Sequence, residues 1–397
     1  MMDYMEQAQA MRETLIAWRR QLHQHPEVGE NLPYTKSFIA QKLTEMGLRY
    51  QEIDRSGLSV VLGNPEKGPC MLVRCDMDGL PIEEKTGLPY ASANGCMHAC
   101  GHDMHTAMLL GTAQLLKQRE NELCGCVKLL WQPAEETMTG AQLMIAGGVM
   151  ENPHVDAAIT IHCDCMSAYR LGDITILNRG ITMASNDIYR IDVEGVGSHG
   201  AFPEQGADPI LAAAAICLSL QEILSREVSA ADRVVLTQGS FHAGSVPNAI
   251  PSHACVEGTV RTFDKNIRAR VLQRMEQIVG HVGSAYRCKA SLTWSGGCQP
   301  LLNDPEICDS IQRSVQELLG EDRFVVEGEQ AYASEDFSNF LDMVPGAQMF
   351  LVVGSTQSGA RYAMHNPCAV FDDAQLPVGS AVLAHVASRW LEESHKA

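Results

Sequence analysis

The segment Met71-Leu-Val-Arg-Cys75 decides the fold, because it is the first of several short, mostly apolar runs that alternate with segments of helical periodicity. Such a run is typical of a strand that is buried on both faces of a sheet. After this segment, we predict helices at 103–118 and 140–146 and further strands at 126–131 and 157–161. Strands that alternate with helices build a mostly parallel sheet with helices on both faces. The sequence therefore predicts an α/β fold.

The same alternation continues toward both ends of the chain. Apolar residues at helical spacing predict helices at 4–23 and 32–46, ahead of the first strand. Late in the chain, a helix at 304–319, a strand at 348–353 and a helix at 373–391 resume the pattern. Both ends are therefore expected in one α/β domain.

Between these parts the pattern changes at about residue 186. Six predicted elements follow in the order βαββαβ: strands at 187–193, 233–241, 254–262 and 290–294, with helices at 208–226 and 266–285. This is the order of a ferredoxin-like split unit. We expect a discontinuous first domain, residues 1–185 and 295–397, and a second domain inserted into it at 186–294.

Composition narrows the class of protein. A chain of 397 residues suits two domains, and its net charge of -18 argues against nucleic acid or anionic membrane as a partner. The beginning of the chain lacks a basic start followed by an apolar core, which argues against a secretory signal. The most apolar stretch, Ile210 to Leu220, falls short of the roughly 20 residues that span a bilayer. Fourteen scattered cysteines then indicate reduced thiols, so a cytoplasmic protein is expected.

The densest chemical signal is Met97-His-Ala-Cys-Gly-His-Asp-Met-His105, which gathers three histidines and a cysteine just before a predicted helix. Cys100 and His102 bracket Gly101, whose conformational freedom lets both side chains turn toward one point. A lone histidine is more often structural. A cluster of this density predicts metal binding.

A second signal, Gln132-Pro-Ala-Glu-Glu136, follows directly after a predicted strand. Open α/β sheets form their active crevices at the carboxyl ends of parallel strands. Glu135 and Glu136 are adjacent and cannot easily do the same work, so one can bind metal while its neighbour reaches a bound water. In isolation such a pair would more often be a solvated helix start.

Two further histidines complete a set of candidate ligands. His162 ends another strand, and His365 lies in a late loop of the same domain. Five side chains exceed what one open metal site needs and suit two metals that share a bridging ligand and a water. Such a centre lowers the pKa of a bound water from about 15.7 to about 7. Glu135 would then act as the general base. The five candidate ligands are Cys100, His102, Glu136, His162 and His365.

These residues belong to motifs spread over nearly the whole chain. Together they resemble the metal-dependent amidohydrolases that include N-acyl-amino-acid amidohydrolases (aminoacylases), hippurate hydrolases, N-acetyldiaminopimelate deacetylases and plant auxin-conjugate hydrolases. The motifs are Arg20-Gln-Leu-His-Gln-His-Pro-Glu27, Arg74-Cys-Asp-Met-Asp-Gly-Leu-Pro-Ile82, Cys100-Gly-His102, Pro133-Ala-Glu-Glu136, Ser198-His-Gly-Ala-Phe-Pro203, Pro247-Asn-Ala-Ile-Pro251, Ser334-Glu-Asp-Phe337 and His365-Asn-Pro367.

The resemblance implies a zinc-exopeptidase-like first domain and an inserted lid and dimerisation domain. It implies metal ligation by the five candidates, with Glu135 as the base. It also implies that His199 polarises the scissile carbonyl and that Asn248 helps to bind substrate. Cys100 stands where more distant relatives bridge their metals with an aspartate. A thiolate favours zinc, with manganese, cobalt and nickel left open.

Relatives of this fold dimerise through the inserted domain, so a homodimer or higher homo-oligomer is expected. His199 lies in that domain, whereas the five candidate ligands lie in the other. It would then act on the metals of the partner subunit. The alternative is that His199 serves its own subunit or only stabilises a turn beside Gly200.

Three other positions carry two interpretations each. Asp78, after a strand, either orients a metal ligand or forms a turn. Arg261 either pairs with a substrate carboxylate or lies on the open face of a strand. Glu335 and Asp336 are expected to cap a following helix rather than take part in catalysis.

The expected reaction is metal-dependent hydrolysis of the amide bond of an N-acyl amino acid, a small molecule. A metallo-dipeptidase or small carboxypeptidase differs only in what flanks the bond. A cysteine hydrolase with Cys100 as nucleophile would leave both glutamates and two histidines without a role. An inactive metal-binding scaffold is the alternative outside enzymes. The acyl group and the amino acid are not predicted.

Overall fold

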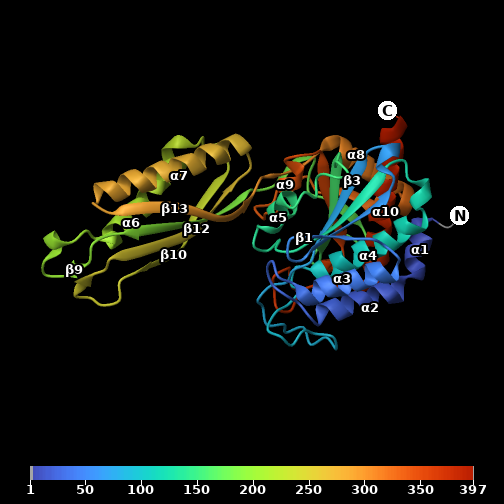
Figure 1. Ribbon diagram of the computed structural model, residues 1–397, viewed down its shortest axis with the longest axis horizontal. Coiled ribbons are helices and arrows are strands. Elements are labelled where there is room, and N and C mark those ends of the chain that lie inside the picture. The colour runs from blue at the N-terminus through green and yellow to red at the C-terminus, as the bar shows by residue number, and fades with distance from the viewer. Residues whose placement is uncertain (1–2, 397) are drawn as a thin grey trace. The chain divides into compact units, whose positions relative to one another are not determined.

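The computed structural model describes residues 3–396 and divides into two compact units (Figure 1). The first unit contains the chain up to Thr182, then Leu302–Gln330, then the chain from Asp336 onward. The inserted unit contains Met183–Leu301 and the short segment Ala331–Glu335. The expected insert at 186–294 thus lies within the inserted unit, to which the sequence assigned no second segment.

The first unit is built on an eight-stranded sheet in the order β1-β2-β4-β3-β5-β16-β6-β15. The neighbours β4, β3, β5 and β16 run parallel, as do β6 and β15, while β1-β2, β2-β4 and β16-β6 are antiparallel. The mostly parallel sheet is therefore confirmed. The strands are β1 Gln51–Ile53, β2 Gly57–Gly63, β3 Cys70–Asp76, β4 Cys126–Gln132, β5 Ala157–Asp164, β6 Ile174–Ile176, β15 Phe324–Val326 and β16 Gly346–Val352.

Helices cover both faces of this sheet because successive strand residues point to opposite sides. On β3, Met71 and Val73 join the core that contains α1, α2, α4 and α10, whereas Leu72 joins a second core with α5 and α9. Every residue of β3 and β4 is buried. The helices are α1 Tyr4–Ala10, α2 Arg12–His23, α3 Pro33–Glu45, α4 His102–Gln118, α5 Gly140–Ala146, α8 Pro305–Leu319, α9 Ser338–Leu341 and α10 Leu376–Lys396.

The first helix differs from the prediction. Residues 4–23 were expected as one helix, but the chain turns at Met11, with φ -94° and ψ 1°. The Met11 N–H bonds the carbonyl of Ala8, three residues back, rather than a carbonyl four residues back. This tightened turn ends α1 and lets α2 begin at Arg12.

The inserted unit has the predicted ferredoxin-like order. Its antiparallel sheet runs β10-β12-β8-β13, and α6 and α7 pack with these strands around one core. On β8, Tyr189, Ile191 and Val193 are buried in that core, while Arg190 between them is exposed. The elements are β8 Asn186–Glu194, α6 Pro209–Glu222, β10 Val234–Ala243, β12 His253–Thr262, α7 Lys265–Ala285 and β13 Lys289–Cys298.

A small pair of strands, β9 Ser198–His199 and β11 Ala249–Ile250, lies outside the main sheet.

Helix α6 continues through a π-helical turn to Glu227, and this 19-residue segment is apolar enough, with a mean hydropathy of 1.3, to cross a membrane. Because it packs against β12 and α7, we interpret it as the core helix of this unit.

Candidate metal centre

The candidate centre lies where β3, β4 and β5 end. Three parallel strands of one sheet place their carboxyl ends at one edge, so the residues that follow them meet there. Asp78 lies just beyond β3, and Glu135 and Glu136 lie just beyond β4. His162 lies near the carboxyl end of β5. His102 is the first residue of α4.

The backbone around these residues takes unusual conformations. Gly101, between Cys100 and His102, has φ 87°, in the left-handed region that favours glycine. Ala134, directly before Glu135, has φ 60°, and His365 has φ 65°. Non-glycine residues in this region are strained by about 1–2 kcal/mol, and such strain gathers at functional sites.

The five predicted ligands form one continuous set of neighbours. The Cys100 Sγ lies 3.5 Å from the His162 Nε2 and 3.3 Å from the His365 Nε2. The Glu136 Oε1 lies 3.4 Å from the His365 Nε2 and 3.9 Å from the His102 Nε2. Four of these side chains are nearly inaccessible to solvent, while that of His365 is 53% exposed. The fold therefore brings together residues that are up to 265 positions apart.

The donor atoms fit a metal. The Nε2 of His102 and the Oε1 of Glu136 are buried, lie 3.9 Å apart and make no hydrogen bond. Leaving a buried polar atom without a partner costs about 1–3 kcal/mol. A cation held between them would satisfy these atoms. The mixture of imidazole nitrogens, a thiol sulfur and carboxylate oxygens is the donor set that zinc accepts.

The charges in the centre also favour a cation. Burial alone lowers the pKa of His102, but the carboxylates of Asp76, Asp78 and Glu136 outweigh it and raise that pKa to about 10. Burial raises the pKa of Glu136, yet His365 and His102 lower it overall. The Glu136 carboxylate is therefore held as an anion, whereas burial raises the pKa of Asp78.

Burial dominates the pKa of another ligand candidate. It lowers the pKa of His162 to about 4, against the attraction of Asp76. His162 is thus neutral near pH 7. The neutral imidazole is the form that binds metal.

Asp78 supports the two glutamates. Its Oδ1 accepts a hydrogen bond from the backbone N–H of Glu135 at 3.1 Å, and its Oδ2 accepts one from Glu136 at 3.3 Å. The Oδ1 also faces the His102 Nδ1 at 3.5 Å. Of the two interpretations of Asp78, these contacts favour the one in which it orients ligands.

Three buried residues of this region were not singled out from the sequence. Asp76 and His105 lie within 4.8 Å of the ring nitrogens of His102 and His162. Arg74 donates to Asp76 and to Asp336. His105 ends the motif Met97–His105 and follows His102 at a spacing that places both on one face of α4, but neither signal gives it a role.

The prediction that Glu335 and Asp336 cap the helix after them is wrong. Helix α9 has no side-chain cap. The Asp336 carboxylate instead accepts hydrogen bonds from the Gln132 amide and from the N–H of Ala141 in α5. It is fully buried and thus ties the end of β4 to the start of α5.

His199 and Asn248 are neighbours within the inserted unit. His199 on β9 lies opposite Ala249 on β11, and the N–H of Gly200 donates to the carbonyl of Asn248 at 2.8 Å. The His199 Nδ1 accepts a hydrogen bond from the N–H of Ala201 at 3.1 Å. The His199 ring is otherwise exposed.

Arg261 holds the short segment Ala331–Glu335 of the inserted unit. Its Nη1 donates to the carbonyl of Tyr332 at 2.9 Å and to the Ser334 Oγ at 2.6 Å. Neither predicted interpretation of Arg261 included these contacts. They account for a charged residue at this position without a substrate.

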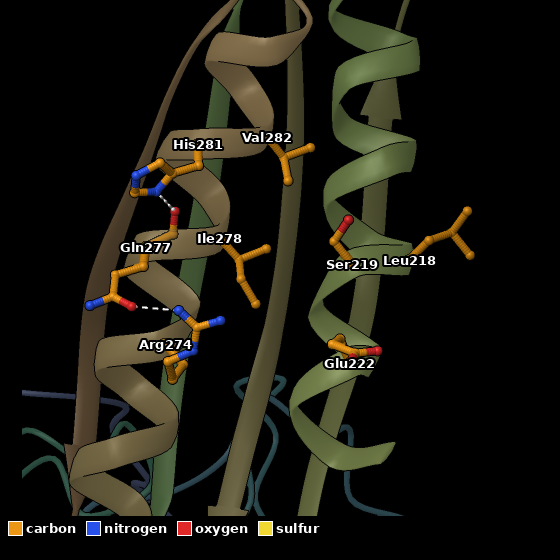
Figure 2. Close-up of a pocket in the computed structure, with 8 residues that line it drawn as sticks. All are labelled: Leu218, Ser219, Glu222, Arg274, Gln277, Ile278, His281 and Val282. Atoms are coloured by element: carbon orange, nitrogen blue, oxygen red, sulfur yellow. Dashed lines mark hydrogen bonds between the residues drawn. The ribbon is translucent and has the colours of Figure 1, made fainter. Parts of the chain in front are cut away.

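A groove of about 670 Å³ lies between α6 and α7, away from every predicted site residue (Figure 2). Leu218 and Glu222 line it from α6, and Arg274, Ile278 and His281 line it from α7. The His281 Nδ1 bonds the carbonyl of Gln277, one turn earlier in the same helix. Among the described residues, no group of three metal-binding side chains with neighbouring ligand atoms lies in this groove, so it is not a second candidate for the chemistry.

Comparison with known proteins gives a consistent result. The model of a family described as peptidase family M20/M25/M40 matches residues 72–389. An N-acetyl-L-cysteine deacetylase of Bacillus subtilis (strain 168) is 36% identical over 96% of this chain and 89% of its own length. Thermostable carboxypeptidase 1 of Saccharolobus solfataricus is 33% identical, over 94% and 93%.

One similar solved structure is described as a metal-binding protein. The YXEP protein of Bacillus subtilis, described as a dinuclear metal binding peptidase from the M20 family, superposes with a TM-score of 0.76. It is 32% identical to this chain, and the match covers 96% of this chain and 99% of that one.

Proposed function

Because the chain belongs to peptidase family M20/M25/M40, we propose that it uses two divalent metal ions to hydrolyse the amide bond of N-acyl amino acids. Family and relatives make it a metal-dependent hydrolase of amide bonds. The finer part of the proposal is the substrate, a small N-acyl amino acid. The observation that carries the proposed two-metal hydrolysis is the set of five neighbouring donors beside a buried, separately held Glu135, and the deacetylase among the relatives supports the substrate class.

We assign the metal ions to the five donors: Cys100, His102, Glu136, His162 and His365. When bound, the ions supply a water of lowered pKa and positive charge beside the substrate carbonyl. Five ligands suit two ions that keep positions open for water and substrate. Zinc is the metal that the thiol favours, with manganese, cobalt and nickel as the other candidates.

Glu135 has the position that a general base needs. A carboxylate oxygen of Glu135 lies within 4.8 Å of donor atoms of both His102 and Glu136, and its side chain is 6% exposed. Asp78 holds its backbone. In the proposed reaction Glu135 takes a proton from the attacking water and gives it to the amine as the C–N bond breaks.

His199 and Asn248 are assigned to the substrate. Because the His199 Nδ1 accepts a hydrogen bond from the Ala201 N–H, the proton of the neutral ring lies on Nε2. That N–H can donate to the acyl oxygen as negative charge develops on it. The neighbouring Asn248 offers an amide for the rest of the substrate. We also assign Arg261 to the substrate carboxylate, through guanidinium donors other than the Nη1 that bonds Tyr332 and Ser334.

A substrate panel tests the proposal against its closest alternative. Zinc-loaded protein is offered N-acetyl and N-benzoyl amino acids and, in parallel, dipeptides of the same residues. We expect faster hydrolysis of the acyl amino acids and two metal ions per chain. Hydrolysis of the dipeptides alone would instead indicate a carboxypeptidase or dipeptidase.

Chelation tests the cysteine-hydrolase alternative. The Cys100 thiol lies beside two histidines, as a catalytic thiol also would. Activity that survives complete metal removal would support a thiol nucleophile. The family and the relatives are hydrolases, which argues against an inactive scaffold.

Assembly and location complete the proposal. We propose a homodimer formed through the inserted unit, in which β10 is an edge strand and α6 exposes Leu211 and Leu218. Unpaired strand edges and exposed apolar side chains are features that a two-fold contact covers. All fourteen cysteines are free, which suits the reducing cytoplasm.

A further inference from the structure

His105 is a buried histidine whose two ring nitrogens are both engaged. The Nδ1 lies 2.5 Å from the Asp76 Oδ1, and the Nε2 lies 2.8 Å from the backbone nitrogen of Cys163. A backbone N–H can only donate, so the Nε2 must be the unprotonated acceptor. The ring proton therefore lies on Nδ1 and is donated to Asp76. Although close to the donor cluster, His105 has no lone pair left for a metal.

Cys163 connects His105 to the neighbouring candidate ligand, His162. The carbonyl of Cys163 lies 2.9 Å from the His162 Nδ1. A carbonyl can only accept, so this Nδ1 carries the proton and the Nε2 of His162 is bare. That bare Nε2 is the atom that faces the Cys100 Sγ at 3.5 Å.

Asp76 is itself fixed from the other side. Its Oδ2 accepts a hydrogen bond from the Arg74 Nη1 at 2.7 Å. The same guanidinium donates to the Gln132 amide oxygen at 2.9 Å and to the Asp336 Oδ1 at 2.6 Å. These groups are all buried, so the carboxylate has one arrangement available to it. A residue from β3 thereby sets the orientation of a side chain on α4.

We propose that Asp76 and His105 form a positioning relay that acts through the backbone of Cys163 to present the Nε2 of His162 to a metal ion. Asp76 fixes the tautomer of His105, His105 holds the Cys163 N–H, and the Cys163 carbonyl holds His162. His105 is thus a positioning residue rather than a metal ligand. The inference rests on the proposed metal centre. Partners of metal-bound histidines typically change metal affinity 10- to 100-fold when removed.

The test compares two buried histidines of one motif. His105→Phe removes both hydrogen bonds while it keeps a ring of similar size. His98→Phe is the matched control, because His98 is equally buried, 1% exposed, and neither of its ring nitrogens makes a hydrogen bond. Cobalt(II) is titrated into each chelated protein against a competing chelator, and its absorption spectrum is recorded.

We expect His105→Phe to weaken one of two cobalt sites by about 10- to 100-fold and to change the cobalt spectrum. His98→Phe should leave both sites within about twofold of the wild type. Unaltered cobalt binding in His105→Phe, or an equal loss in both variants, would overturn the relay. A wild-type protein that binds fewer than two ions would instead count against the proposed centre.

A second variant guards against a His105→Phe chain that does not fold. Asp76→Asn has the same shape, but it must turn its NH2 group toward either the Arg74 guanidinium or the His105 Nδ1. The first choice opposes two donors. The second forces the wrong tautomer on His105, which then opposes the Cys163 N–H. We expect the same cobalt site to weaken, and unchanged cobalt binding in this folded variant would also overturn the relay.

A purely structural role predicts a different result. It would lower the urea midpoint of the chelated protein while leaving cobalt affinity and the cobalt spectrum as in the wild type. That combination in either variant would contradict the relay.

Discussion

Glu135 and Glu136 are adjacent in sequence but have different surroundings. The Glu136 carboxylate faces His102 and His365, whereas Glu135 is held through its backbone beside them. Glu135→Gln should keep both metals and lose about 10²- to 10⁴-fold in kcat, because an amide cannot take the proton. Glu136→Gln should lose metal instead. Turnover and metal content of the two purified variants measure this, and reversed phenotypes would show that the roles are exchanged.

His98 provides a pH prediction at the same scale. Burial lowers its pKa to about 4, against about 6.5 in the unfolded chain. The folded state therefore binds fewer protons between these values, and stability is lost as the pH falls through this window. The loss is about 1.4 kcal/mol per pH unit, or roughly 2 kcal/mol between pH 6.5 and 5.

The matched comparison uses His98→Phe, with both proteins chelated so that metal release does not contribute. Urea unfolding at pH 7 and pH 5 should show a smaller fall in stability for the variant than for the wild type. The other buried histidines are common to both proteins and cancel. Equal falls would mean that His98 is already charged in the folded state.

At the scale of single elements, the start of α4 controls two ligand candidates. Gly101 has φ 87°, and a Cβ built on it would lie 2.8 Å from the Phe371 ring. Gly101→Ala should therefore cost about 1–2 kcal/mol in backbone strain, disturb Cys100 and His102, and reduce metal affinity. Gly95→Ala is the control, because Gly95 has φ 82° but open space around it.

Both glycine variants should lose stability in urea, but only Gly101→Ala should lose metal affinity in a chelator competition. If Gly95→Ala lost metal to the same extent, the effect would come from general destabilisation of the loop rather than from the geometry of Gly101.

The sequence predicts most long and buried elements well and short ones poorly, although it misses the seven-residue β2. The strands β3, β4 and β5 are runs buried on both faces, and their pattern is visible without any partner. By contrast, β1, β6 and β15 are three residues each, too short for a periodicity to emerge. Their pairing depends on contacts that only the folded chain provides.

The site residues that the sequence identified lie in local motifs, whereas one that it missed depends on a distant partner. Cys100, His102 and Glu136 lie in dense local motifs at strand or helix ends, where function concentrates. Asp336 lies 262 residues from its partner Arg74, and no local pattern predicts that pairing. Its acidic neighbours before an apolar run instead suggested a helix cap.

At the scale of the whole molecule, the proposed dimer decides which subunit supplies His199. The test mixes His199→Ala with Glu135→Gln, each inactive alone, under conditions that exchange subunits. If His199 serves the partner, each mixed dimer has one site with both lesions and one with neither, so up to half of its sites should regain activity. If His199 serves its own subunit, every site carries a lesion. A mixture that stays inactive despite proven exchange would exclude the arrangement in trans.

The two-piece build of the inserted unit limits how the domain can be exchanged. The chain enters it at Met183 and leaves it at Leu301, yet Ala331–Glu335 belongs to it as well. Arg261 binds this return segment through Tyr332 and Ser334, and the N–H of Ala184 bonds the carbonyls of Ala331 and Ala333. The unit is therefore built from two separate pieces of sequence. A chimaera that grafts a relative's domain between 183 and 301 alone would join a foreign domain to the native return segment. Only a graft that carries both pieces should yield a stable hybrid enzyme.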